Sequence, residues 1–338
     1  MSINENDIYN FSFCDNPKIS IIIPVHDYQK YIYILHKSIQ DQSFQDLEII
    51  YIDDFSTDNS TETIQKLQKK DKRIILLKNK EKKGPFYSRN KGAIFARGEY
   101  IQFIDGDDII VGDILEKAYL IAKIQNIEVV QYLYIQKHGK DNFKIKEITK
   151  KGIIYQPELS DQMYYGKGHL EQCNFFILNK LIKTETFLKA LILIGDDVLK
   201  EKLYYNEDLL QLFSLLRVSN SFLFIEHIGY VRFNRDENKL SLVKSGLNPR
   251  YTNTIFHDNF IELKTLYNMT KNNKHDKAVC LDFLRMNSIS YGPVISRITE
   301  GYELFEEVFN VLLNSEFFND GQKSMFKRLR KKLMKNRK

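Results

Sequence analysis

The sequence predicts an α/β fold built on a doubly wound parallel sheet, and three observations support this prediction. Apolar runs of strand length alternate with amphipathic helical patterns between residues 18 and 135. The runs are almost continuously apolar, which is typical of parallel strands covered on both faces. Several of these runs end directly in Pro or Asp residues, and open α/β sheets bind their ligands at that edge.

Each element follows from its local pattern. The expected strands are residues 18–25, 47–52, 73–77, 100–104 and 128–135. Between them, helices are expected at 29–41 and 86–97, and another after the candidate caps Ser56, Thr57 and Asp58. This alternation implies right-handed crossovers between parallel strands.

The composition indicates a folded, globular protein, with 43% hydrophobic and 28% charged residues in a chain of 338. No apolar run approaches the ~20 residues that a membrane-spanning helix needs. The first sixteen residues lack the pattern of a secretory signal. The three cysteines, Cys14, Cys173 and Cys280, are far apart, which favours a reducing compartment. We therefore expect a cytoplasmic location, with peripheral contact at a membrane surface left open.

Positive charge is concentrated at the end of the chain. Residues 323–338 hold nine Lys or Arg and no acid, so without them the net charge of +6 becomes −3. This distribution argues against a nucleic-acid-binding domain, which would spread basic residues over a folded face. Met325, Phe326, Leu329 and Leu333 lie along one side of the basic segment. Attachment to an anionic membrane surface and a disordered solubilising tail both remain open.

The most informative stretch is the acidic turn after the fourth strand, which contains Asp105, Asp107 and Asp108. Three carboxylates so close together repel, and a hard cation such as Mg²⁺ or Mn²⁺ would relieve the repulsion. A solvated turn capping the next helix is the alternative. The chain has neither of the usual glycine-rich phosphate loops. A nucleotide bound here would therefore be held by carboxylates and a metal.

The order and spacing of five motifs resemble the catalytic domain of family 2 glycosyltransferases, which have the GT-A fold. The motifs are residues 19–28, 52–58, 88–92, 98–100 and 103–108. Two departures stand out. Phe55 replaces the usual Gly, and His26-Asp27 replaces the commoner Tyr-Asn.

The resemblance implies a role for several residues of the first half. Asp54 would accept a hydrogen bond from a uracil-like base, and Pro24 would line the same pocket. Asp105 would face the ribose or the metal, and Asp107 is the leading metal ligand. For Asp53-Asp54 the alternative is a helix-capping turn. Arg89 would approach the sugar or the acidic residues, or it would form local ion pairs on a helix surface.

The second half contributes two further candidates. Glu207 and Asp208 open an apolar helix, where the helix dipole alone could explain two acids. An acid in an apolar environment also has a raised pKa, which suits a general base. By resemblance, Asp208 is the base that deprotonates the acceptor hydroxyl and Glu207 supports it. Arg232 or Arg235 would bind a diphosphate, or they would form a flexible, solvated pair.

These expectations define a domain plan and a function. Residues 1–16 form an extension, and residues 17–245 a GT-A domain with a nucleotide half (17–135) and an acceptor half (136–245). Residues 246–320 form a helical region and residues 321–338 the basic tail.

The resemblance implies a Mn²⁺- or Mg²⁺-dependent, inverting transfer from a nucleotide-sugar, with UDP expected, to a hydroxyl of a glycan, lipid-linked or other acceptor. The alternative is an inactive relative that binds a nucleotide-sugar or a partner. Neither reading requires a nucleic acid.

Overall fold

We describe the protein from a computed structural model of the full chain. The structure describes residues 16–138, 142–145, 152–156, 176–204 and 207–234, and eight single positions farther on. The chain divides into two compact units, Met1–Arg235 and Asp236–Lys338, and all the helices and strands named below lie in the first. Apart from single positions, the predicted N-terminal extension, helical region and basic tail lie outside the described residues.

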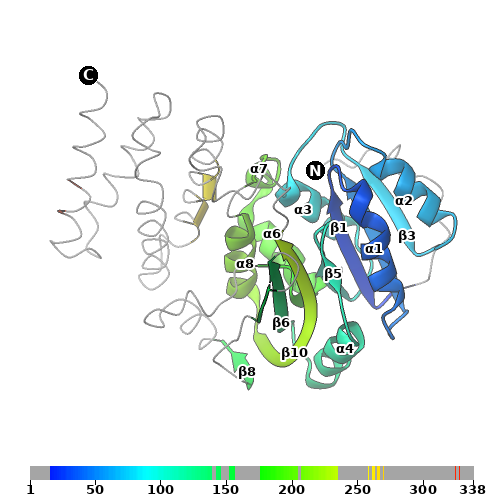
Figure 1. Cartoon of the computed structure of the whole chain (residues 1–338). Helices are drawn as coiled ribbons and strands as arrows, with labels where there is room; N and C mark the ends of the chain where they lie inside the picture. Colours follow the sequence, from blue (N-terminus) through cyan, green and yellow to red (C-terminus); the bar gives the residue numbers. More distant parts are fainter. Residues whose placement is uncertain are drawn as a thin grey trace. The chain divides into compact units, whose positions relative to one another are not determined.

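Four parallel strands form one half of the sheet (Figure 1). They are β1 (Ile19–Val25), β2 (Leu47–Asp53), β3 (Ile74–Lys78) and β4 (Tyr100–Phe103). β1 pairs with β2 and with β4, and β3 is the edge strand beside β2. Every residue of β1 and β2 is buried, because helices cover both faces of a parallel sheet. The predicted bounds of these four strands agree with the structure within one residue.

Three of the four helices of this half are where the sequence places them, and the fourth, α4, had no predicted range. They are α1 (Gln29–Gln40), α2 (Ser60–Gln68), α3 (Pro85–Phe95) and α4 (Ile114–Gln125). α3 packs directly on β1 and β2. Gly92 makes this close approach feasible, since a Cβ there would lie 2.5 Å from Ile22 Cγ2 and 2.8 Å from Ile52 Cδ1. One turn earlier on α3, Arg89 is consequently held against the ends of the strands.

The other half of the sheet is mixed. β9 (Lys180–Lys183) runs antiparallel between β4 and β6 (Val129–His138), and β10 (Ser221–Asn234) runs parallel to β6. β5 (Ile109–Ile110) and β8 (Gly152–Tyr155) pair with β10, and β7 (Asn142–Ile145) pairs with β6. The sheet is therefore not parallel throughout, because β9 lies between β4 and β6 and pairs with each of them in the antiparallel sense.

Three helices complete the unit: α6 (Thr184–Ile194), α7 (Asp196–Leu199) and α8 (Glu207–Val218). α6 packs against α3 and α8. This packing fixes α8 relative to α3, although the two are more than a hundred residues apart in the sequence. Among the described residues, no helix combines the length and apolar character needed to cross a membrane.

Candidate functional site

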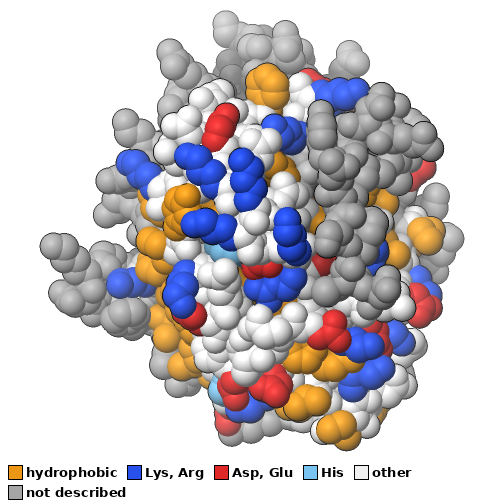
Figure 2. Space-filling model, turned by 90° about the vertical axis from the view of Figure 1, so that its right-hand side faces the viewer, with side chains coloured by type: hydrophobic (Ala, Val, Ile, Leu, Met, Phe, Trp, Pro, Cys, Tyr) orange, Lys and Arg blue, Asp and Glu red, His pale blue; other side chains and the backbone are white. Residues whose placement is uncertain are grey.

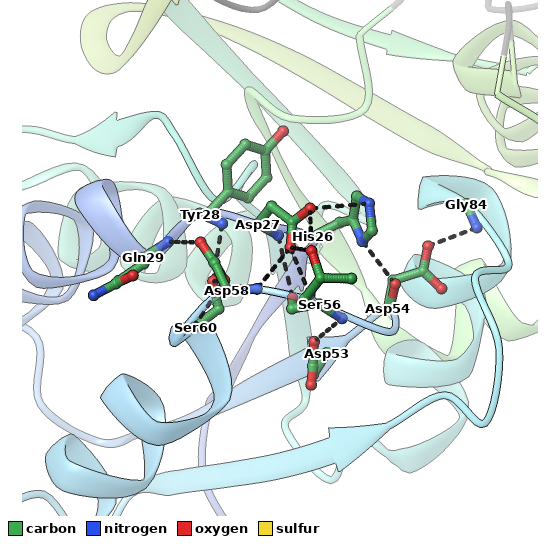
Figure 3. A network of polar contacts seen from close by, with 11 residues as sticks. His26, Asp27, Tyr28, Gln29, Asp53, Asp54, Ser56, Asp58, Ser60 and Gly84 are labelled. Atoms are coloured by element: carbon green, nitrogen blue, oxygen red, sulfur yellow. Dashed lines mark hydrogen bonds and ion pairs between the residues drawn. The ribbon is translucent and has the colours of Figure 1, made fainter.

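The loops after β1 and β2 are joined by hydrogen bonds at the carboxyl edge of the sheet (Figure 3). The Asp27 carboxylate accepts from the backbone N–H groups of Thr57 at 2.7 Å and Asp58 at 3.2 Å. Asp58 Oδ2 in turn accepts from the backbone N–H of Gln29 at 3.0 Å. Because each loop satisfies backbone groups of the other, this edge of the sheet is held in one conformation.

Two residues of these loops have left-handed backbones, Asp27 with φ 57° and Phe55 with φ 63°. Asp adopts the left-handed region readily, but a bulky residue such as Phe is strained in this conformation. Phe55 is also 53% exposed, so burial does not offset the strain. A positive φ favours glycine, which explains why Gly usually stands at this position. Phe55 departs from that pattern at a cost in backbone strain.

Asp53 and Asp54 have different partners. Asp53 accepts from the backbone N–H of Ser56 at 3.0 Å and from the Thr61 hydroxyl, so it holds the turn before α2. The buried Asp54 faces the segment before α3. Its carboxylate accepts from Asn79 Nδ2 at 2.8 Å, and from the backbone N–H groups of residues 83 and 84 at 2.7 and 2.8 Å. Asp53 therefore holds the turn before α2 without capping a backbone N–H of the helix, and Asp54 holds the loop before α3.

The acidic turn after β4 packs against β1 and β10. Gly106 lies so close to the ring of Tyr28 that a Cβ would come within 2.4 Å of it. Asp108, 3% exposed, accepts from the Tyr230 hydroxyl at 2.8 Å and from a backbone N–H of β10 at 2.9 Å. Burial and the neighbouring carboxylates hold the pKa of Asp108 well above its usual range. Asp108 thus ties the turn to β10, and the backbone N–H of Asp105 donates to the same Tyr230 hydroxyl at 3.1 Å. The carboxylate of Asp105 bonds to Arg89 instead.

Arg89 connects the acidic turn to the start of α8. Its guanidinium donates from Nη2 to Asp105 Oδ1 at 2.8 Å. From Nη1 it donates to Glu207 Oε1 and to Asp208 Oδ1, both at 3.0 Å. Arg89 is only 3% exposed and its partners lie in other segments, so it does not form local ion pairs on a helix surface. The structure thus brings together four predicted site residues from three distant segments.

The carboxyl groups of Glu207 and Asp208 are both perturbed by burial. Burial and the adjacent Asp208 raise the pKa of Glu207 to about 7, against the opposing effect of Arg89. Burial also raises the pKa of Asp208, and Arg89 is the first of the cations that oppose it. The side chain of Asp208 is 18% exposed and that of Glu207 10%. Asp208 is therefore the more accessible acid of the pair, and each titrates in a way that depends on the other.

Two further cations act on Asp208. Arg232 lies with its guanidinium carbon 4.2 Å from the centre of the Phe176 ring, and it lowers the pKa of Asp208. Arg232 thus stacks on an aromatic ring, and Arg235 lies outside the described residues. Lys180, fully buried, donates from Nζ to the Phe176 carbonyl at 2.5 Å and also lowers the pKa of Asp208.

Sequence reasoning missed Lys180 and the role of Tyr230. For Lys180 a signal existed, since it is a lone lysine in a largely apolar segment that ends in Leu181 and Ile182. Nothing local indicates that the Tyr230 hydroxyl donates to Asp108.

The donor set at this edge suits a hard cation. Among the residues that the structure describes, no cluster of three or more His, Cys, Asp or Glu side chains is placed to hold a metal. Asp105 and Asp107 would supply one or two carboxylates, which is what Mg²⁺ takes when phosphate oxygens and water complete its shell. Asp108, already bonded to β10 through both oxygens, is less suited to this task.

The sheet is mixed, with one half parallel. Carboxylates lie at its strand ends, and a buried acid pair faces them. These features define the class as a GT-A type glycosyltransferase fold. Residues 20–185 match the model of Glycosyl transferase family 2. These residues, about half of the chain, therefore belong to glycosyltransferase family 2, as the five motifs predict.

Several curated proteins are similar to this chain over about half of its length. It is 37% identical over 145 residues to a GalNAc(5)-diNAcBac-PP-undecaprenol beta-1,3-glucosyltransferase of Campylobacter jejuni, covering 43% of this chain and 46% of that protein. It is 33% identical over 175 residues to glycosyltransferase GlyG of Streptococcus pneumoniae (50% and 58% covered). A third relative is the UDP-Glc:alpha-D-GlcNAc-diphosphoundecaprenol beta-1,3-glucosyltransferase WfaP of Escherichia coli, 41% identical over 159 residues (46% and 57%). The chain spans about half the length of these relatives.

Solved structures with the same fold include S. aureus TarS 1-349 in complex with UDP-GlcNAc. The TM-score is 0.69 at 19% identity, with 94% of this chain and 89% of that chain covered. The same fragment without the nucleotide-sugar gives a TM-score of 0.66 at 18% identity, with 94% and 88% covered. At this level of identity the likeness shows a common fold.

Proposed function

We propose that this protein transfers a sugar from a UDP-sugar to a hydroxyl group of a lipid-linked glycan, with inversion at the anomeric carbon. The observation that carries the proposal is the buried contact of Arg89 with Asp105 on one side and with Glu207 and Asp208 on the other. The carboxylate of the predicted donor side and the acid pair of the predicted acceptor side are thereby parts of one site.

Asp208 is the proposed general base. Arg89 bonds to Oδ1, which orients the carboxylate and leaves Oδ2 for an acceptor hydroxyl. A raised pKa brings the carboxylate closer to the range in which a base accepts a proton efficiently at neutral pH. As the hydroxyl proton moves to Asp208, the oxygen attacks the anomeric carbon. The bond to the nucleoside diphosphate breaks on the opposite face.

Glu207 and Arg232 support this step. Glu207 holds the second position on Arg89 Nη1 and so fixes the guanidinium between the two acids. Arg232, stacked on Phe176, offers paired donors for the departing diphosphate. Asp105 and Asp107 would hold Mn²⁺ or Mg²⁺, which when bound stabilises negative charge on a leaving diphosphate. Pro24 and Asp54 are proposed to bind the base.

The names of two relatives support the donor and the acceptor. WfaP is a UDP-Glc glucosyltransferase, and its acceptor and that of the Campylobacter jejuni relative are undecaprenol-linked. The TarS structure with UDP-GlcNAc has the same fold. We extend the donor class and the lipid-linked acceptor from these proteins to this chain as part of the proposal.

Replacing the base tests the mechanism. We expect Asp208→Asn to bind UDP as the unchanged protein does and to lose at least about a hundredfold in transfer, because general base catalysis contributes roughly 10²–10⁴-fold. Asp197→Asn on α7 is the control, since that side chain is fully exposed and its ion pair is with Lys200. Full turnover in Asp208→Asn would remove Asp208 from the mechanism. If the unchanged protein binds UDP but transfers no sugar, the alternative of an inactive relative holds instead.

A further inference from the structure

The segment from α2 to the start of α3 is strongly basic. Residues 66–83 contain eight Lys and one Arg against two acids. Six of the lysines are exposed, and we call them the α2–β3 basic face: Lys66, Lys69, Lys70, Lys72, Lys78 and Lys80. Figure 2, which views the side of the molecule where α2 and β3 lie in Figure 1, shows basic side chains gathered over this side.

The two acids of the segment do not neutralise this face. Asp71 is 8% exposed and bonds to Arg73 and His36. Glu81 is shared between Lys83 and Lys202. Within the described part of the chain, none of the six lysines of the face forms an ion pair. Their charges are therefore directed to solvent.

Charge in this protein is segregated. Residues 66–83 carry a net +7, and residues 1–322 as a whole carry −3. The remaining residues before the tail consequently carry −10. A protein that needed charge only for solubility would mix the two signs over its surface. Separation of this size orients a molecule in the field of a charged surface.

We propose that the α2–β3 basic face binds the surface of a membrane that contains anionic lipids. Lysine, a point charge on a flexible stem, suits diffuse attraction to headgroups, whereas planar recognition of phosphodiesters favours Arg. The only Arg of the segment is paired with Asp71. Residues 66–83 contain no aromatic residue on which a nucleic acid base could stack. The chemistry of the face therefore favours lipid headgroups over nucleic acid.

This attachment would bring the proposed site close to the bilayer. Lys78 ends β3 at the carboxyl edge of the sheet, and the next residue, Asn79, donates to Asp54. The end of the face formed by Lys78 and Lys80 thus shares one edge with the predicted base pocket, whereas Lys66, Lys69, Lys70 and Lys72 lie toward the amino end of β3. A lipid-linked acceptor would approach the site from the side of Lys78 and Lys80. The binding itself does not depend on transferase activity, and either can fail without the other.

Vesicle sedimentation with the full chain tests the proposal. The vesicles are phosphatidylcholine alone, or phosphatidylcholine with one quarter phosphatidylglycerol, at 0.1 M and 1 M salt. The face variant combines Lys66→Gln, Lys69→Gln, Lys70→Gln and Lys72→Gln. The control combines four substitutions of exposed lysines elsewhere, Lys30→Gln, Lys123→Gln, Lys189→Gln and Lys200→Gln. The tail variant combines Lys327→Gln, Arg328→Gln, Arg330→Gln and Lys331→Gln.

We expect the unchanged protein to bind only the anionic vesicles and to dissociate at 1 M salt, where the Debye length is about 3 Å. Each lysine near the surface contributes up to about fivefold, so the face variant should bind at least tenfold more weakly while the control binds normally. Three results would overturn the proposal. They are an equal loss of vesicle binding in the face variant and the control, a loss of binding in the tail variant alone, and no binding by the unchanged protein. Tighter binding to a DNA or RNA duplex at the same salt would also overturn it. Unchanged thermal unfolding and UDP binding of the face variant exclude misfolding.

Discussion

Glu207 makes the stability of this protein depend on pH in a way that one substitution can isolate. The residue is only 7% exposed and lies beside Asp208, and together burial and the neighbouring acid raise the pKa of its carboxyl group from 4.5 to about 7. Glu207→Gln keeps the shape of the side chain and an oxygen that can accept from Arg89. It removes only the group that titrates.

The magnitude follows from proton linkage. Because the pKa is higher in the folded protein, the folded state keeps a proton that the unfolded state releases as the pH rises above 4.5. The contribution of Glu207 to stability is therefore complete below pH 4.5 and is lost as the pH passes 7. The rise from 4.5 to about 7 corresponds to a loss of about 3 kcal/mol, at ~1.4 kcal/mol for each pH unit.

Urea unfolding of both proteins at pH 4.5, 6 and 7.5 measures this difference. We expect Glu207→Gln and the unchanged protein to be about equally stable at pH 4.5, and the variant to be more stable by about 3 kcal/mol at pH 7.5. Glu62→Gln, at an exposed position of α2, is the control and should show no such trend. A difference between Glu207→Gln and the unchanged protein that stays constant over this pH range would refute the reasoning.

Three other substitutions test single contacts of the site. Arg89→Met should lower the free energy of unfolding by about 3–5 kcal/mol, because it leaves buried carboxylates without their cation; a loss below 1 kcal/mol in urea unfolding would contradict this. Phe55→Gly should raise stability by up to ~1 kcal/mol, since relief of ~1–2 kcal/mol of strain outweighs the added chain entropy, whereas Phe55→Ala keeps the strain and should not raise the melting temperature. Tyr230→Phe should cost about 1–3 kcal/mol by removing a donor from Asp108, and a melting temperature equal to that of the unchanged protein would argue against the bond.

Local patterns were sufficient for the first half of the sheet. Parallel strands buried on both faces are largely apolar along their length, so β1 and β2 are visible as apolar runs, interrupted only by Ser20 and Glu48, that end at a polar turn. The ends of such strands meet at one edge whatever the details of packing. For this reason the acidic turn could be placed at the ligand-binding edge without knowledge of the tertiary structure.

The partners of each acid could not be predicted in the same way. The resemblance assigns Asp54 to a base, yet its carboxylate is bonded to the loop before α3. Asp105, Asp107 and Asp108 look equivalent in the sequence. Only the arrival of β10, with Tyr230, separates Asp108 from the other two.

The sequence by itself determined the fold class and the four parallel strands, because these depend on periodicity and spacing within about ninety residues, and the resemblance to family 2 glycosyltransferases supplied the candidate site residues. The tertiary structure alone decided that Arg89 joins Asp105 to Glu207 and Asp208, and that β9 enters the sheet antiparallel. The physical reason is that these contacts are set by the packing of α3, α6 and α8 across more than a hundred residues, and a local pattern carries no record of such a distant partner.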